Sequence, residues 1–289
     1  MAGLSERGAV VITGASTGIG EATAIRLATS GFTVFAGVRK DADADKLQSQ
    51  SLPELRPIKI DVADAKSITA ALELVTAEVG DRGLAGLVNN AGISGGGPLE
   101  FTGMDEVRAM FEVNVFGLIA TTQAFLPLIR KATGRVVCTG SISGRTSVPF
   151  VAPYSMTKAA VQSLCHALRV ELRPWGIEVV CIEPGSIATP IWDKGLSEFD
   201  ERAEALPPEA HALYGGLLTK LKALTERTAK TGIPPARVAD VVYEALTAKR
   251  PRARYLVGMD ARAQAALGRM PDRVRDAALS RFIGVESKP

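Results

Sequence analysis

Tyr154, Lys158 and Ser141 are the residues whose types and spacing could do chemistry together. Tyr154 and Lys158 are four residues apart, so a helix would place both side chains on one face. An ammonium group beside a phenol lowers the pKa of the phenol from about 10, which lets a tyrosine act as an acid or a base near neutral pH. A Tyr–Lys pair at this spacing is common by chance, so its meaning depends on what lies around it.

Ser141 supplies that context, because it follows an apolar run, residues 135–139, that predicts a buried strand. A helix predicted from about 154 to 173, beginning at Pro153, comes next in the chain. In a parallel sheet, the strand ends and the helices that follow them border the same crevice. We therefore expect the three side chains to meet at one point.

A glycine-rich turn near the N-terminus could hold a dinucleotide phosphate. The apolar run Ala9–Ile12 predicts a buried strand, and residues 18–29 have the spacing of a helix. Gly14 lies between them, and Gly18 and Gly20 lie in the first turn of the helix. Glycines there let the backbone turn tightly and approach a pyrophosphate, which the helix N-terminus then stabilises. A merely tight turn is the alternative, but the position between strand and helix favours the phosphate site.

The second strand, predicted over 33–38, indicates which dinucleotide binds. Folds that prefer NAD place a carboxylate at this strand end for the ribose 2′-hydroxyl, whereas an arginine can pair with the 2′-phosphate of NADP. Here Val38 is followed by Arg39, and the first acid, Asp41, comes later. We therefore favour NADP(H) as the cofactor. NAD(H) is the alternative, in which case Arg39 is only a solvated charge.

Strands and helices alternate along the chain. Strands are predicted at 9–12, 33–38, 57–60, 84–88, 135–139, 178–182 and 254–257, and helices at 18–29, 65–79, 104–131, 154–173 and 236–248. This predicts an α/β fold in one domain, 1–289, built on a single doubly wound parallel sheet of the Rossmann type. Residues 191–232 are helix-prone and are expected to cover the substrate, and 258–289 to form a helical C-terminal tail.

Several further short motifs accompany these residues. In order, the set is Thr13-Gly14-xxx-Gly18-x-Gly20, Asp61-Val62, Asn89-Asn90-Ala91-Gly92, Asn114, Ser141, Tyr154-xxx-Lys158 and Pro184-Gly185. In order and spacing this set resembles the short-chain dehydrogenase/reductase superfamily, and the resemblance extends over nearly the whole chain.

The resemblance implies a role for each matching residue. Tyr154 would give or take the proton, Ser141 would hydrogen-bond the substrate oxygen, and Lys158 would bind the nicotinamide ribose and assist Tyr154. Asn114 would anchor a water in the proton relay. The residues implied around the dinucleotide are Gly14, Ser16, Thr17, Gly18, Ile19, Gly20, Arg39, Asp61, Val62, Asn90, Ala91, Gly92, Tyr154, Lys158, Pro184, Gly185, Ile187 and Thr189.

One branch of the superfamily is especially similar. Residues 34–37, 86–94, 125–130 and 251–255 resemble retinol, 17β-hydroxysteroid and mitochondrial 3-hydroxybutyrate dehydrogenases. The branch implies hydride transfer between nicotinamide C4 and a small-molecule carbonyl or alcohol, many of its substrates being lipophilic. Two departures limit this inference: Thr139-Gly140-Ser141 replaces the commoner Ser-Ser, and 191–232 matches only in helical character, so the substrate identity does not carry over.

Two other functions would use the same fold. A 3-oxoacyl-type reductase would need the same catalytic residues, and a non-catalytic dinucleotide-binding regulator would need none of them. The intact set of Asn114, Ser141, Tyr154 and Lys158 argues against the regulator. The family also implies a homodimer or homotetramer, with helices 104–131 and 154–173 at the interface.

Composition excludes several classes of protein. With 46% hydrophobic and 22% charged residues in 289, the chain is not disordered and can bury a large core. Its 34 Lys and Arg against 31 Asp and Glu leave a net charge of +3, too small a surplus for a dedicated nucleic-acid partner. Three widely spaced cysteines and two histidines predict buried free thiols and no metal site.

The two ends of the chain add expectations about location. No secretory signal is expected, because the N-terminus lacks an apolar region, and no apolar run approaches the roughly 18 residues of a transmembrane segment. We therefore expect a cytoplasmic protein. Residues 231–289 carry 11 Lys or Arg against six Asp or Glu. The basic segment 260–284 predicts an amphipathic helix that packs on the domain or on another subunit, with membrane-surface contact as the alternative.

Overall fold

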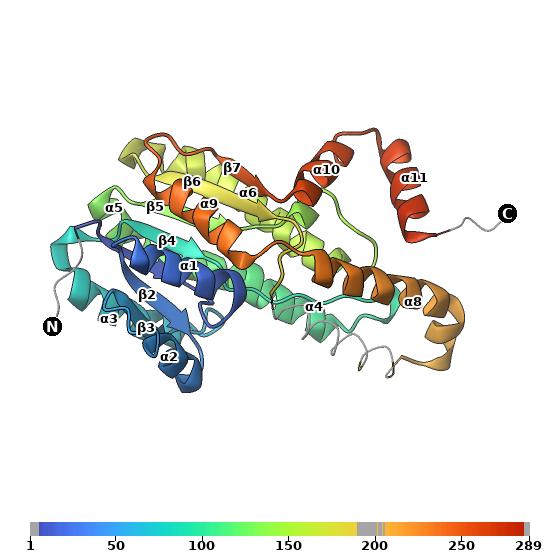
Figure 1. The fold of residues 1–289 in the computed structure, drawn as a ribbon, viewed down its shortest axis with the longest axis horizontal. Helices are drawn as coiled ribbons and strands as arrows, with labels where there is room; N and C mark the ends of the chain where they lie inside the picture. Colours follow the sequence, from blue (N-terminus) through green and yellow to red (C-terminus); the bar gives the residue numbers. More distant parts are fainter. Residues whose placement is uncertain (1–5, 190–200, 202–203, 205, 286–289) are drawn as a thin grey trace.

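Seven parallel strands form one sheet in the computed structural model, in the order β3-β2-β1-β4-β5-β6-β7 (Figure 1). The structure describes residues 6–189, 201, 204 and 206–285. The strands are β1 Ala9–Ile12, β2 Thr33–Val38, β3 Leu55–Lys59, β4 Gly86–Asn89, β5 Arg135–Thr139, β6 Glu178–Pro184 and β7 Arg254–Val257. The predicted α/β fold with a doubly wound parallel sheet is confirmed.

The strands are apolar because helices cover both faces of the sheet. Every residue of β1, β2 and β4 is buried. The helices are α1 Gly18–Thr29, α2 Asp41–Gln48, α3 Ala65–Val79, α4 Met104–Phe111, α5 Leu118–Ala132, α6 Ala152–Glu171, α8 Pro208–Thr231, α9 Pro235–Thr247, α10 Met259–Leu267 and α11 Asp272–Ile283.

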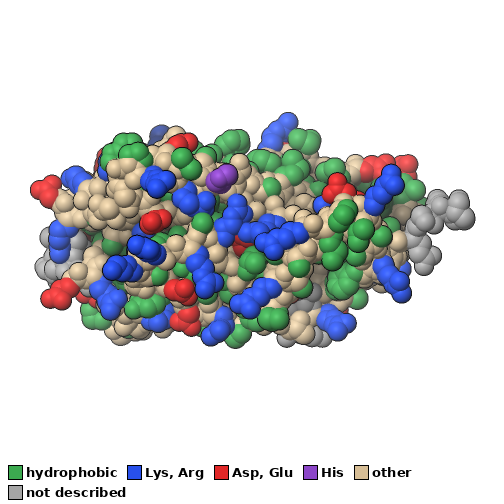
Figure 2. Space-filling model, turned by 90° about the horizontal axis from the view of Figure 1, so that it is seen from above, with side chains coloured by type: hydrophobic (Ala, Val, Ile, Leu, Met, Phe, Trp, Pro, Cys, Tyr) green, Lys and Arg blue, Asp and Glu red, His purple; other side chains and the backbone are tan. Residues whose placement is uncertain are grey.

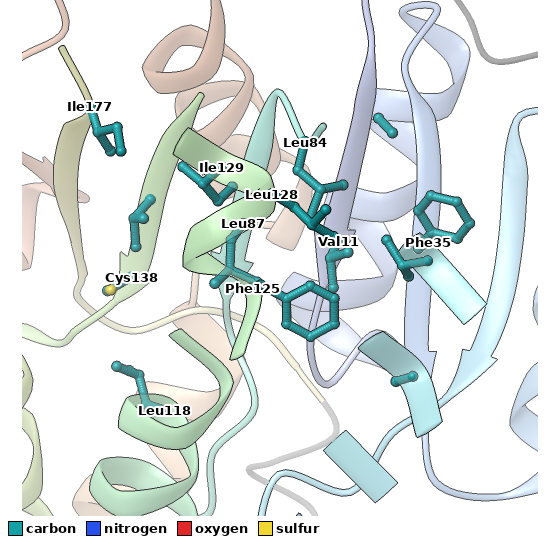
Figure 3. Packing of buried hydrophobic residues seen from close by; sticks show 14 of the residues in the cluster. Val11, Phe35, Leu84, Leu87, Leu118, Phe125, Leu128, Ile129, Cys138 and Ile177 are labelled. Carbon is teal, nitrogen blue, oxygen red and sulfur yellow. The ribbon is translucent and has the colours of Figure 1, made fainter. Parts of the chain in front are cut away.

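Two hydrophobic clusters, one on each face, join these layers. On one face, Val11, Phe35 and Leu87 from the sheet pack with Phe125 and its neighbours from α5 (Figure 3), and α3 and α6 complete the layer. On the other face, α1 and α9 lie side by side over Val10 and the alternate residues of the central strands. The sheet is therefore held as a rigid platform for the segments at its edge.

The crevice follows from the strand order. The chain builds β1, β2 and β3 outward in one direction and then returns to β4 on the other side of β1, with Val10 paired to Val34 in β2 and to Gly86 in β4. At such a reversal the loops after the two central strands diverge and leave a crevice beyond the carboxyl ends of the strands. The segments that follow β1, β4, β5 and β6 border this crevice.

Five elements differ from prediction. The helix expected at 104–131 contains a π-helical segment, Glu112–Gly117, between α4 and α5. The helix expected at 260–284 is divided into α10 and α11, because Pro271 disfavours helical geometry at the residue before it. The short helix α2 was not predicted, and β3 and β4 begin two residues away from their predicted starts.

The expected absence of a membrane-spanning stretch needs qualification. The helical stretch Met104–Ala132 is long and apolar enough to cross a bilayer by length and composition, but half of its most apolar part is buried. Since α5 contributes Phe125, Leu128 and Ile129 to the core, this stretch has the character of a core helix. Of the segment expected over 191–232, residues 191–200, 202, 203 and 205 lie outside the described residues.

The three cysteines are free and buried, as predicted, and lie together. Cys138 in β5 is the register partner of Cys181 in β6, and Cys165 lies on α6 above them. The hydrogen bond with Cys138 is the main cause that raises the pKa of Cys165, and the hydrogen bond with Cys165 together with burial raises that of Cys181. The three groups are therefore thiols that fill the core.

We expect a thiol reagent such as DTNB to leave all three cysteines of the native chain unmodified at about pH 8, and to label all three in urea. The thiolate is the attacking form, and a raised pKa together with burial removes both the thiolate and its access to the reagent. Absorbance at the thionitrobenzoate band measures the labelling. Fast labelling of the native chain would contradict this burial.

Candidate active site

The turn after β1 can be made only with glycine at several positions. Gly14 and Gly18 have φ of +66° and +59°, in the left-handed region that favours glycine. A Cβ on Gly14 would lie 2.7 Å from the Ala91 Cα, and one on Gly20 would overlap the Gly14 carbonyl oxygen. The turn therefore packs its backbone directly against the loop after β4.

Polar contacts hold these two loops together. The Thr13 hydroxyl accepts hydrogen bonds from the amides of Asn90 and Ala91, each at 3.0 Å. The Asn90 side-chain amide donates to the carbonyls of Thr13 and Gly14 at 3.2 and 3.0 Å. This bonding fixes the carboxyl ends of β1 and β4, the two strands at which the sheet order reverses.

The same region fits the phosphates of a dinucleotide. Helix α1 begins directly after the turn, and its N-cap residue, Thr17, makes no capping hydrogen bond with its side chain. The first amides of α1 are thus left for an anion. Ser16 and Ile19, which were also predicted to contact the cofactor, lie half-buried in this turn.

The end of β2 presents a positive charge. Arg39 is exposed and forms no hydrogen bond or ion pair with any described residue. Asp41, the first acid after the strand, accepts a hydrogen bond of 2.8 Å from Lys59, which lowers the pKa of the Asp41 carboxyl. The nearby carboxylate is therefore paired, while the guanidinium is available.

Asp61 and Val62 follow β3, at the same edge of the parallel sheet as the turn after β1 and the end of β2. The Asp61 carboxylate accepts a hydrogen bond from the Ala63 amide at 3.1 Å, and the Asp61 amide donates to the Ser67 hydroxyl at 2.8 Å. Val62 is buried against Gly117, where a Cβ would lie 2.7 Å from the Val62 carbonyl oxygen. This contact brings the π-helical segment against the loop after β3.

The predicted meeting of the β5 end with α6 is built around Lys158. Its side chain is buried, and its Nζ donates to the Thr139 carbonyl at 3.0 Å and lies 5.7 Å from the ring centroid of Tyr154. A Cβ on Gly92 would lie 3.6 Å from this Nζ. The lysine thus lies between the strand end, the tyrosine and the loop after β4.

Ser141 is held in the turn that follows β5. Its carbonyl accepts a hydrogen bond from the Gln162 side chain on α6 at 2.8 Å, and its hydroxyl accepts one from the Ser143 amide at 3.1 Å. A Cβ on Gly144 would lie 2.7 Å from the Lys158 backbone, so α6 and the turn are in direct contact. The structure therefore joins the Ser141 turn to α6, the helix that carries Tyr154 and Lys158 one turn apart. That the three side chains meet at one point stays a prediction.

Asn114 lies in the π-helical segment that the sequence did not reveal. Its Oδ1 accepts from the Ile93 amide, and its Nδ2 donates to the Ile93 carbonyl, both at 2.8 Å, and to the Thr157 hydroxyl at 3.0 Å. π-helical turns are frequent at functional sites. Here the side-chain amide links the loop after β4 to the helix of Tyr154, and the water-anchoring role stays a prediction.

The loop after β6 borders the crevice on its far side. Pro184 ends the strand, and a Cβ on Gly185 would overlap the Asp260 carboxylate, which accepts a hydrogen bond from the Ser186 amide at 2.6 Å. Ile187 is buried and bridges to Ile233, while Thr189 is half-buried. Backbone pairing between 186–188 and 233 fixes the direction of this loop.

Sequence reasoning missed a buried carboxylate next to this loop. The Glu183 side chain is fully buried and binds two arginines, Arg145 through Nε and Arg254 through Nη1 at 2.9 Å. Arg145 ends the turn that contains Ser141, and Arg254 begins β7. The signal was present, because a lone acid in the apolar run 179–184 must find a partner when the strand is buried.

An aromatic cluster joins α8 to the segments that follow β4 and β5. The Tyr214 ring on α8 makes edge contacts with Phe101 and Phe150, with centroids 6.0 and 6.3 Å away. Its hydroxyl donates to the Glu100 carboxylate at 2.9 Å, which raises the pKa of Tyr214. Helix α8 is thereby attached to the segments after β4 and β5.

The family model for the short chain dehydrogenases matches residues 8–198, which include β1 to β6 and all the catalytic candidates. The chain belongs to this family. Its members are oxidoreductases that act on alcohol and carbonyl groups with a nicotinamide dinucleotide, and the Gly14 turn and the Lys158 region fit that cofactor.

Curated relatives place this dehydrogenase in the expected branch. It is 36% identical over 272 residues to the NADPH-dependent 3-dehydrocapnine reductase of Ornithobacterium rhinotracheale, covering 92% of this chain and 94% of the relative. It is 36% identical over 259 residues to the mitochondrial D-beta-hydroxybutyrate dehydrogenase of Rattus norvegicus (86% and 76% covered). It is 35% identical over 269 residues to retinol dehydrogenase 16 of Mus musculus (88% and 81% covered).

Solved structures agree with this assignment. A short chain dehydrogenase from Burkholderia cenocepacia in complex with NADP superposes with a TM-score of 0.71, at 25% identity and with 98% of each chain covered. The fold of this dehydrogenase and its place in the family are therefore established from both sequence and structure.

The two arginines on Glu183 allow a matched test of its effect on the dehydrogenase site. Arg145→Met and Arg254→Met each remove one partner of the same buried carboxylate, so both should lower the melting temperature. Only Arg145 belongs to the Ser141 turn, so we expect only Arg145→Met to lower kcat, by about tenfold, with the KM for cofactor unchanged. An unchanged kcat in both variants would mean that Glu183 acts on stability alone, and an equal loss of kcat in both would contradict a specific role of Arg145.

Proposed function

We propose that this chain is an NADP(H)-preferring oxidoreductase that interconverts a lipophilic alcohol and its carbonyl compound. The observation that carries the proposal is the buried Lys158 ammonium, which donates to the Thr139 carbonyl at the end of β5 and lies near the Tyr154 ring and Gly92. A buried cation needs a defined set of partners, and here it is held beside the tyrosine that would transfer the proton.

Each residue has a separate task in this reaction. A bound nicotinamide supplies the hydride in reduction and accepts it in oxidation. Ser141 holds the substrate oxygen by a hydrogen bond, and Tyr154 gives its phenolic proton to that oxygen as negative charge develops there. The Lys158 ammonium stabilises the phenolate that remains, and Asn114 keeps the loop after β4 aligned with α6.

The preference for NADP(H) rests on the end of β2. The exposed Arg39 guanidinium has no partner among the described residues and can form two hydrogen bonds to a phosphate. Asp41 is paired with Lys59, so it does not compete for that guanidinium. The NADPH-dependent relative and the NADP-bound neighbour support the same preference.

The proposal of a lipophilic substrate is based on the aromatic cluster. Phe101, Phe150 and Tyr214 give the substrate side of the crevice an apolar lining, and α8 acts as its cover. A reductase named for 3-dehydrocapnine and a retinol dehydrogenase are among the similar proteins.

The oligomer that we propose is a homodimer or homotetramer. Its interface would be formed by α5 and α6, and α6 exposes Met156 and Val170.

A turnover screen tests the reaction and the substrate class. We expect oxidation of NADPH with long-chain or polycyclic ketones or retinal, and little turnover of small hydrophilic ketones. Tyr154→Phe should lower kcat by a factor of about 100 to 10,000 and leave cofactor affinity unchanged, because only the proton donor is lost. Faster turnover of 3-oxoacyl thioesters would favour that type of reductase. Cofactor binding without any turnover would favour a regulator.

Cofactor choice is tested with Arg39→Ala, comparing kcat/KM for NADPH and NADH. Loss of a charge-assisted contact to the 2′-phosphate should lower kcat/KM for NADPH by about ten- to a hundredfold and leave NADH nearly unchanged. Lys40→Ala is the matched control, since Lys40 is the neighbouring exposed cation. Equal use of both dinucleotides by the unmodified enzyme would refute the role of Arg39.

A further inference from the structure

The last two helices carry large apolar side chains that are exposed to solvent. Met259, Met270, Val274 and Phe282 are exposed by 76%, 45%, 53% and 70%. They lie on α10, on α11 and in the short link between them. Figure 2 looks down on these helices and shows hydrophobic side chains flanked by Lys and Arg in the right half of the molecule.

Arginines accompany these apolar residues. Arg262, Arg269, Arg273 and Arg281 are exposed, and none forms an ion pair with a described residue. On α11, Val274, Ala278 and Phe282 are spaced four residues apart, and Arg281 comes three residues after Ala278, so all four lie on one side of the helix. We use the name C-terminal face for the apolar residues Met259, Met270, Val274 and Phe282 together with Arg262, Arg269, Arg273 and Arg281.

The acidic side chains of α10 and α11 bind other groups and do not belong to the C-terminal face. Asp260 turns inward and accepts a hydrogen bond from the Ser186 amide. Asp272 and Asp276 both pair with Arg275, and helical periodicity places these two acids on the side of α11 opposite Val274. The C-terminal face is therefore apolar and positive, with no carboxylate among its residues.

The two helices are attached to the body of the enzyme. The Thr146 hydroxyl donates to the Gln264 carbonyl of α10 at 3.0 Å, and Lys220 of α8 donates to the Gly284 carbonyl, just after α11, at 2.9 Å. Figure 1 shows α10 and α11 at the end of the molecule that also carries α8. The C-terminal face therefore keeps a set position relative to the crevice.

We propose that the C-terminal face docks onto a bilayer surface that contains anionic lipids. Apolar side chains on an amphipathic helix enter the boundary between headgroups and acyl chains, and arginines beside them bind lipid phosphates and carboxylates. A second copy of the chain is a poorer occupant. In a two-fold symmetric contact the same patch meets itself, so its arginines would be brought close together with no acid of the patch to pair with them.

Vesicle sedimentation of the full chain tests this proposal. We expect the protein to sediment with phosphatidylcholine vesicles that contain about 30% phosphatidylserine, and much less with phosphatidylcholine alone. Raising the salt from about 50 mM to about 500 mM should release it, because the attraction is screened. The double variant Arg273→Glu, Arg281→Glu should weaken binding by about tenfold or more, and Phe282→Ser should weaken it without changing the preference for anionic vesicles.

A control on the opposite part of the molecule separates the C-terminal face from general charge. Lys66→Glu combined with Leu74→Ser changes one exposed cation and one 46% exposed apolar residue on α3, and should bind vesicles like the unmodified chain. Three results would overturn the proposal. These are no binding to anionic vesicles, an equal loss in the α3 control, and a dimer in light scattering that Phe282→Ser dissociates without lipid. All readouts are independent of catalytic activity.

Discussion

The hydrogen bond from the Lys158 ammonium to the Thr139 carbonyl is the contact on which the site depends. A buried cation is costly unless polar groups surround it, so the end of β5 and α6 must stay in register. Gly144 permits this because a side chain there would collide with the lysine backbone, and the loop at Gly92 comes close to the ammonium. The positions of the Ser141 turn and of Tyr154 follow from this one pairing.

Two amide side chains hold further segments in place around the crevice. Asn90 binds the turn after β1, and Asn114 binds the loop after β4 and the helix of Tyr154. Each uses short, fixed bonds to backbone groups, so the segments that border the crevice are positioned before any ligand arrives. Such preorganisation lowers the entropic cost of placing a cofactor and a substrate in reactive geometry.

The sequence revealed the sheet because its signals are local. The runs that form β1, β2 and β7 are short, apolar and bounded by polar residues or glycine, and their predicted limits match the structure. Helix α2 was missed because residues 41–48 are rich in aspartate and contain a single buried residue, Leu47. The π-helical segment depends on contacts with the loops after β3 and β4. The partners of Glu183 come from two distant segments. Neither the π-helical segment nor the pairing of Glu183 leaves a local pattern in the sequence.

The match to the family ends at residue 198, before α8 begins at Pro208. Of the chain after that point, β7 pairs with β6 and α9 packs against α1, so both belong to the sheet domain, whereas α8 is joined to the segment after β4 by contacts such as Tyr214 with Glu100. Substitutions on the exposed side of α8 therefore leave the buried ammonium and the glycine turn undisturbed. In evolutionary terms, a lineage can vary this one helix while the sheet and its bonded loops stay fixed.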